Sequence, residues 1–167
     1  ERSAALRERI LDAVKGVPVK DIVILSDGFI PHLAETVMPE AQAELDRMKA
    51  EGRDRIIVSA SPIEIVQELA DKLGLEGAVG TRSEIKNGKY TGKLAGPFCY
   101  GEGKVLAIEQ LAKERGYNLA ESVAYSDSIS DLPFMQAVGK AVAINADLPL
   151  TGFALEQGWR VVETRGD

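Results

Sequence analysis

Residues 123–134 read VAYSDSISDLPF, a short apolar run that ends in two aspartates four residues apart. The run is typical of a buried strand, and a helix is predicted from about Ile129. A strand that passes into a helix through a short polar turn is the repeating unit of a parallel sheet covered by helices. The stretch therefore predicts an α/β fold, and it places two carboxylates where a buried strand ends.

The same alternation of strand and helix runs through the rest of the chain after residue 38. Ser61, Pro62 and Glu64 form a capping-box sequence at the start of one helix, and Asn87-Gly88 is the turn signal of a hairpin. Because most of the strands are short and apolar throughout, the pattern predicts a doubly wound parallel sheet. The predicted strands are 55–59, 77–81, 122–126, 140–145 and 159–163, the hairpin is 83–94, and the helices are 39–52, 61–75, 103–116, 147–157 and the one from about 129.

Residues 1–38 differ from the rest because their pattern is helical. Residues 3–15 place Leu6, Ile10 and Val14 on one helix face. Residues 19–37 are apolar and rich in β-branched side chains, and we expect helical segments interrupted at Pro31.

Composition narrows the class of protein. The chain has 167 residues, of which 45% are hydrophobic, and a formal net charge of −6. This suits one ordinary globular domain, argues against general nucleic-acid binding and allows a small anionic ligand. A single cysteine cannot form an internal disulfide, and no apolar run approaches the roughly 18 residues of a membrane span. We expect a cytoplasmic protein whose partner is a small molecule, with neither nucleic acid nor membrane.

Ligands of such sheets bind beyond the carboxyl ends of the strands, so the polar residues there are the candidates for function. Asp127 and Asp131 are one helical turn apart and can face the same mouth of the sheet. Mg²⁺ takes one or two carboxylates and keeps water and phosphate oxygens as its other ligands. The alternative is that Asp127 and Ser128 only cap the following helix.

Two further residues suit a phosphate. Lys104 lies among glycines at the start of a helix, where its ammonium adds to the positive helix end, although a lysine there can equally be a solvated surface residue. Ser59 ends a strand and can offer its hydroxyl, with the backbone N–H groups around Ala60 and Ser61. Its alternative is an ordinary turn serine.

In their order along the chain, these features resemble the haloacid dehalogenase superfamily. The stretches VSAS, GTRSEIKNGKYTGKLAGPFCYGEGK and AYSDSISDLPFMQAVGKAVAINAD are similar to the second, third and fourth motifs of its phosphoserine-phosphatase-like branch. The resemblance implies a Mg²⁺-dependent phosphomonoesterase that forms an aspartyl-phosphate and acts on a small phosphorylated metabolite. It implies that Ser59 and Lys104 bind the phosphoryl group, that Asp127 binds Mg²⁺, and that Asp131 lies in the outer shell of the metal or orients Lys104. Asn145 falls where the family often has a polar residue near the site, or is a loop turn residue.

One family feature is missing, since the first motif is a strand ending in D-x-D and no D-x-D occurs in the 167 residues. In the family this strand lies between the strands that carry the serine and the metal-binding acid, and a helical cap follows it. Residues 1–38 are therefore interpreted as the end of the cap, residues 39–167 as the core, and the nucleophile strand as lying upstream of Glu1. The alternative is a non-catalytic phosphate-binding or regulatory module, either a degenerate relative or a receiver-like domain.

Overall fold

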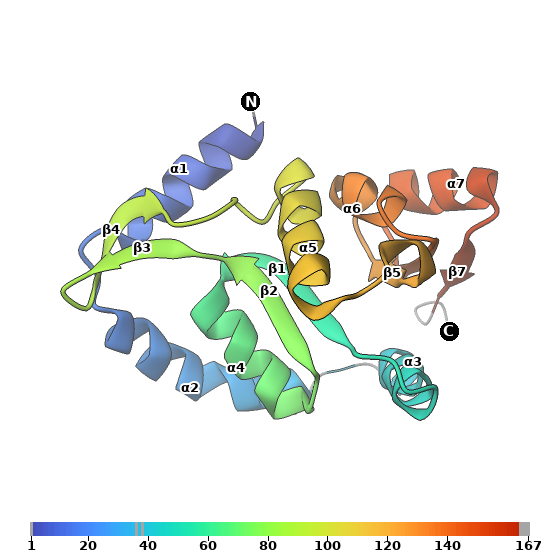
Figure 1. Ribbon diagram of the computed structural model, residues 1–167, viewed down its shortest axis with the longest axis horizontal. Helices are drawn as coiled ribbons and strands as arrows, with labels where there is room; N and C mark the ends of the chain where they lie inside the picture. The colour runs from blue at the N-terminus through green and yellow to red at the C-terminus, as the bar shows by residue number, and fades with distance from the viewer. Residues whose placement is uncertain (1, 36, 38, 164–167) are drawn as a thin grey trace. The chain divides into compact units, whose positions relative to one another are not determined.

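The computed structural model describes residues 2–35, 37 and 39–163. The chain divides into two compact units, Glu1–Cys99 and Tyr100–Asp167, each with its own strands and helices (Figure 1). Strands pair in parallel in both units, which confirms the predicted α/β class. The boundary near residue 38 between a cap and a core stays a prediction.

The elements of the first unit follow the predicted order, with three helices before the first strand. They are α1 (Arg2–Val14), α2 (Val19–Glu35), α3 (Pro39–Ala50), β1 (Ile56–Pro62), α4 (Ile63–Leu73), β2 (Gly77–Thr81), β3 (Ser83–Lys86) and β4 (Lys89–Leu94).

Helix α2 continues through Pro31, where an interruption was expected. Proline lacks a backbone N–H and normally breaks a helix interior. Here α2 packs along α4, and Ile30 is fully buried beside the proline. The hydroxyl of Ser26 also donates a 2.6 Å hydrogen bond to the Glu68 carboxylate of α4. Packing against a second helix therefore overrides the local signal.

The predicted capping box at Ser61 is wrong, because the preceding strand is longer than expected. Strand β1 continues to Pro62, which lies opposite Thr81 of β2. The Thr81 hydroxyl donates 2.8 Å to the carbonyl of Ala60 and so helps to hold the chain extended. Pro62 is the residue that precedes α4, and no side chain caps this helix end.

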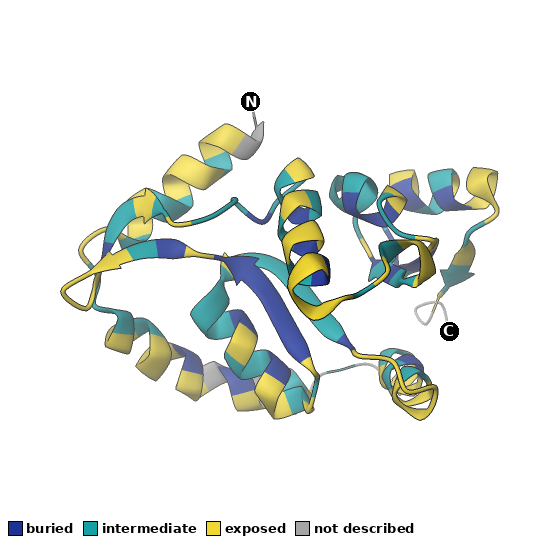
Figure 2. Ribbon diagram, in the orientation of Figure 1, coloured by how far each residue is buried: buried dark blue, intermediate teal, exposed yellow. Residues whose placement is uncertain are grey.

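The core of the first unit lies between α4 and the β1–β2 pair. Val66 and Ala70 of α4 pack on Ala78 of β2, with Ile57, Ile63 and Leu75 around them. Strand β2 is buried along its whole length (Figure 2). At Gly80 an added Cβ would lie 2.9 Å from the Ser61 carbonyl oxygen and from the Ile63 Cα, so only glycine lets β2 pass this close to the strand-to-helix turn.

The predicted hairpin at Asn87-Gly88 is confirmed. Both residues have positive φ angles, 52° and 77°, as a type I′ turn requires. Behind the turn, the backbone of Tyr90 pairs with the segment between α1 and α2 through the Gly16 N–H and the Val17 carbonyl. Burial, together with the negative charge of Glu64, raises the pKa of Tyr90 to about 12.

The second unit repeats strand and helix around a parallel sheet of order β5-β6-β7. Its interior combines small side chains of the strands with larger ones from the helices, and the buried residues include Ala124, Ala141, Val142, Ala143, Phe134, Met135 and Leu150. The elements are α5 (Glu102–Arg115), β5 (Val123–Ser126), α6 (Leu132–Gln136), β6 (Lys140–Ile144), α7 (Leu148–Gln157) and β7 (Arg160–Val162), with 3₁₀ turns at Leu119–Glu121 and Ile129–Asp131.

The predicted helix from about Ile129 begins as the second of these 3₁₀ turns and becomes α-helical at Leu132. Among the described strands, β1 pairs only with β2 and β5 only with β6, so each has one edge without a described strand partner. No helix in the described part of the chain combines the length and apolar character needed to cross a membrane.

A buried arginine ties the start of β1 to the segment before β2. The Arg55 guanidinium makes two 2.9 Å hydrogen bonds to the two oxygens of Glu76 and donates 2.7 Å to the Gly74 carbonyl. The hydrogen bond from Arg55 lowers the pKa of Glu76 from 4.5 to about 2. A lowered carboxyl pKa means that the pair stabilises the fold above about pH 4.5, and that this contribution is lost as the pH falls toward 2.

We predict that Glu76→Gln lowers the free energy of unfolding at pH 7 by about 1–3 kcal/mol, in the lower half of that range because Glu76 is partly exposed. The difference between variant and parent should shrink as the pH falls below 4.5, the ordinary pKa of the group. Urea unfolding at pH 7 and at acid pH measures the decrease in the free energy of unfolding and its dependence on pH. Glu51→Gln, at an exposed ion pair with Arg53, is the matched control and should change little. An equal decrease in the free energy of unfolding at both pH values would contradict the assignment of the lowered pKa to Glu76.

Candidate active site

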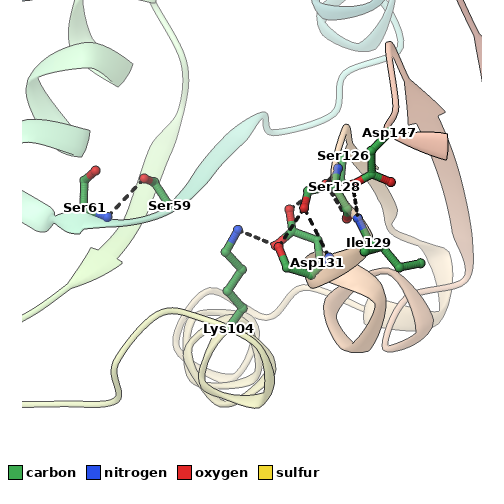
Figure 3. Close-up of polar contacts among 9 residues, drawn as sticks. Ser59, Ser61, Lys104, Ser126, Ser128, Ile129, Asp131 and Asp147 are labelled. Atoms are coloured by element: carbon green, nitrogen blue, oxygen red, sulfur yellow. Dashed lines mark hydrogen bonds and ion pairs between the residues drawn. The ribbon is translucent and has the colours of Figure 1, made fainter. Parts of the chain in front are cut away.

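The predicted site residues lie within a strand, in the first turn of a helix or in segments that follow strands, in both units, and several of them are drawn in Figure 3. Ser59 was predicted to end its strand, but it lies in the middle of β1, because this strand continues to Pro62, and Ala60 follows it within the same strand. Lys104 is in the first turn of α5, and Asp127 follows β5 directly. Five of the predicted residues belong to the second unit, namely Lys104, Asp127, Ser128, Asp131 and Asn145. A shared phosphate between Ser59 and Lys104 stays a prediction.

A buried ion pair joins α5 to the turn after β5. Lys104 Nζ lies 2.6 Å from Asp131 Oδ1, and the two side chains are only 10% and 14% exposed (Figure 3). The ammonium also lies 5.8 Å from the centre of the Phe134 ring, within the range of a cation–π contact. Lys104 and Asp131 are therefore in direct contact, and the role of Asp131 in orienting Lys104 stays a prediction.

The second oxygen of Asp131 is also engaged. Ser126 donates its hydroxyl to Asp131 Oδ2 at 2.6 Å, and the Ser128 N–H donates to the same hydroxyl at 3.1 Å. Both carboxylate oxygens of Asp131 thus have partners within the protein. This arrangement favours the orienting role over direct binding of a cation.

Asp127 and Ser128 have different surroundings, although they are neighbours in sequence. Ser128 caps the 3₁₀ turn, accepting a hydrogen bond from the Ser130 N–H at 3.2 Å. The Asp127 side chain is exposed and is not the capping group. The alternative in which both residues only cap the helix therefore holds for Ser128 but not for Asp127.

Asn145 directly follows β6 and has a left-handed conformation, with φ 46°, which asparagine tolerates better than most residues. It is buried, and its N–H donates 2.9 Å to the Val162 carbonyl of β7. The backbone conformation agrees with the turn interpretation of this residue.

Sequence reasoning missed Asp147, which follows in the same loop. Its Oδ1 accepts from the Leu150 N–H at 2.8 Å and its Oδ2 from the Ile129 N–H at 3.0 Å. An aspartate directly before a helix is a recognisable cap. Its contact with the turn after β5 has no signal in the sequence.

In the first unit, the hydroxyl of Ser59 accepts a hydrogen bond from the backbone. The Ser61 N–H donates to Ser59 Oγ at 3.2 Å. This places the hydroxyl of Ser59 beside the Ser61 N–H within the second half of β1. One of the N–H groups proposed for a phosphate is thereby engaged by the serine itself.

The donor set suits Mg²⁺ only as a partial site. In residues 2–35, 37 and 39–163, no group of three or more His, Cys, Asp or Glu side chains is arranged to hold a metal ion. Mg²⁺ needs few protein ligands because it keeps several waters and binds phosphate oxygens. The exposed carboxylate of Asp127 fits that requirement as one ligand.

Comparison with known proteins shows the family to which the chain belongs. Residues 1–136 match the family model described as haloacid dehalogenase-like hydrolase. A phosphoserine phosphatase of Mycobacterium tuberculosis is 36% identical over 163 residues, which cover 97% of this chain and 53% of the relative. The chain spans about half the length of the curated relatives it matches.

Two solved structures are similar to this chain in fold. A protein of unknown function from Bordetella pertussis has a TM-score of 0.84 at 26% identity, covering 93% of this chain and 72% of that one. A substrate-bound phosphoserine phosphatase has a TM-score of 0.66 at 26% identity, covering 98% of this chain and 72% of that one.

We predict that Asp131→Asn lowers the free energy of unfolding by about 3 kcal/mol, because it leaves the buried Lys104 ammonium without its counter-charge. The double variant Lys104→Met with Asp131→Asn should recover part of this loss, since no buried charge remains. Chemical unfolding of the parent, of the single variants Lys104→Met and Asp131→Asn, and of the double variant gives the coupling energy. Lys86→Met, at an exposed pair with Glu84, is the control and should cost well under about 1 kcal/mol. Additive single effects would show that the pair is not coupled.

Proposed function

Because the chain belongs to the haloacid dehalogenase-like hydrolase family, we propose that it carries the phosphate-binding and metal-binding side of a Mg²⁺-dependent phosphomonoesterase. The observation that carries the proposal is the buried ion pair between Lys104 of α5 and Asp131 in the turn after β5. Asp127, in the same turn, has an exposed carboxylate. A buried ammonium fixed by a carboxylate and aimed at a strand end suits an anionic ligand.

Each side chain has a defined part in this proposal. Lys104 offsets negative charge on the phosphoryl oxygens, and Asp131, held by Ser126, keeps the ammonium in place. In the first unit, Ser59 is the proposed hydroxyl donor to a phosphoryl oxygen. Asp127 is the metal ligand, and Mg²⁺ supplies further neutralisation of phosphoryl charge when bound.

The covalent step needs an attacking aspartate, and we propose that it is not among these 167 residues, which contain no D-x-D sequence. The carboxylate attacks phosphorus, the bond from phosphorus to the ester oxygen breaks, and the leaving alcohol takes up a proton. Water then hydrolyses the aspartyl-phosphate, which releases phosphate and restores the carboxylate.

The domain assignment and the substrate class belong to the same proposal. Residues 1–38 include the helices α1 and α2, which suits part of a helical cap, and residues 39–167 are the proposed core. The relatives named phosphoserine phosphatase support a small phosphorylated metabolite as substrate.

Orthophosphate should bind to the parent chain through Lys104. We predict that Lys104→Ala weakens this binding by about 1.5–3 kcal/mol, the size of a charge-assisted hydrogen bond. Calorimetric titration, run at a temperature where circular dichroism shows both proteins folded, measures the change. Lys86→Ala, on the exposed hairpin, is the control. If the two substitutions weaken binding equally, phosphate binds through general surface charge and the placement is wrong.

Catalysis tests the whole proposal. We predict that residues 1–167 alone show no Mg²⁺-dependent hydrolysis of an aryl phosphate, because loss of a nucleophile commonly costs several orders of magnitude in rate. A longer chain that includes a D-x-D strand should be active, and Asp127→Asn should remove that activity.

Two outcomes would contradict this assignment. Turnover by residues 1–167 that disappears in Asp27→Asn would identify Asp27 as the nucleophile. An inactive longer chain with an intact D-x-D strand would favour the non-catalytic phosphate-binding module.

A further inference from the structure

Asp147 joins two loops at the carboxyl ends of neighbouring strands. It follows β6, and its carboxylate caps α7 by accepting from the Leu150 N–H at 2.8 Å. The other carboxylate oxygen accepts from the Ile129 N–H at 3.0 Å, in the turn after β5 (Figure 3). One side chain therefore satisfies a backbone donor in each loop.

The backbone of Asp147 makes a third contact with the same turn. Its N–H donates 2.8 Å to the carbonyl of Asp127. The turn is thus held on both sides of Ser128, at the carbonyl of Asp127 and at the N–H of Ile129. These two bonds hold the peptide planes on either side of Ser128, the first of which adjoins Asp127.

We propose that Asp147 is a positioning residue for Asp127, holding the turn 127–129 so that the exposed carboxylate is presented to a divalent cation. This inference rests on the proposed function, because it assigns the support of the proposed metal ligand. It assigns no contact between Asp147 and the cation, since both Asp147 oxygens are engaged by backbone donors. Groups that orient metal ligands commonly change metal affinity when they are replaced.

The capping and positioning roles of Asp147 can be separated by substitution. Serine is about as good a helix cap as aspartate, so Asp147→Ser keeps an acceptor for the Leu150 N–H. Its single, shorter oxygen cannot also reach Ile129. Asn118→Ala is the matched control, because it removes the cap of the 3₁₀ turn Leu119–Glu121, which precedes β5 at its other end.

The experiment compares the full chain with these two variants and with Asp127→Asn. Binding of Mn²⁺ alone is followed through the electron paramagnetic resonance signal of the free ion. We expect Asp147→Ser to weaken Mn²⁺ binding about 10–100-fold, Asn118→Ala to leave it unchanged and Asp127→Asn to remove it. Hydrogen exchange of the Ile129 amide should be faster in Asp147→Ser and unchanged in Asn118→Ala.

The outcomes separate this inference from the proposed function. Parent-like Mn²⁺ affinity in Asp147→Ser, with binding still dependent on Asp127, would overturn the positioning role and leave the metal site standing. Unchanged exchange at Ile129 in Asp147→Ser would also overturn it. If the parent chain shows no Asp127-dependent Mn²⁺ binding, the proposed metal site is wrong, and the exchange rate still decides whether Asp147 holds the turn.

Discussion

The ion pair between Lys104 and Asp131 is the contact on which the second unit's site depends. Removing an ammonium and a carboxylate from water costs several kcal/mol for each ion, and this cost is offset only when the remaining hydrogen-bonding capacity is met. Ser126 meets that need on the carboxylate side, where it donates to the oxygen that Lys104 leaves free. The pair therefore fixes the first turn of α5 against the turn after β5.

This fixed pair gives the two aspartates of the turn separate roles. Asp131 is committed to protein partners on both oxygens, whereas Asp127 remains exposed at the strand end. A carboxylate that is held in place by its backbone but has an exposed side chain is suited to an incoming cation or ligand. Two acids follow this buried strand because they do different things. Asp131 stabilises the turn, and Asp127 is exposed to solvent.

Because the chain belongs to the haloacid dehalogenase-like hydrolase family, the polar residues near its strand ends are candidates for binding a phosphorylated ligand. Parallel strands place their carboxyl ends at one edge of a sheet, so residues from successive strand-to-helix turns can act on one ligand. Within the second unit, Asp127 and Asp147 show how two such turns are linked through backbone hydrogen bonds. In the first unit, Ser59 lies within β1 rather than in a turn after it, and its hydroxyl accepts a hydrogen bond from the Ser61 N–H.

Local patterns were sufficient to predict most elements and the kinds of residue at the site. Alternating strands and helices follow from hydrophobic periodicity, and the turn at Asn87-Gly88 follows from the backbone conformations these residues tolerate. The same reasoning failed where a distant segment changes the local preference. The capping box at Ser61 is replaced by extended backbone paired with β2, and α2 passes through Pro31 because α4 supports it.

The sequence by itself determined the α/β class, the order of the elements and the candidate residues Ser59, Lys104, Asp127 and Asp131, because each depends on neighbours in the chain. Only the tertiary structure decided which of them meet. Lys104 and Asp131 are 27 residues apart, and Asp147 and Ile129 are 18 apart. Such contacts depend on how strands and helices pack, and no periodicity within one segment encodes them.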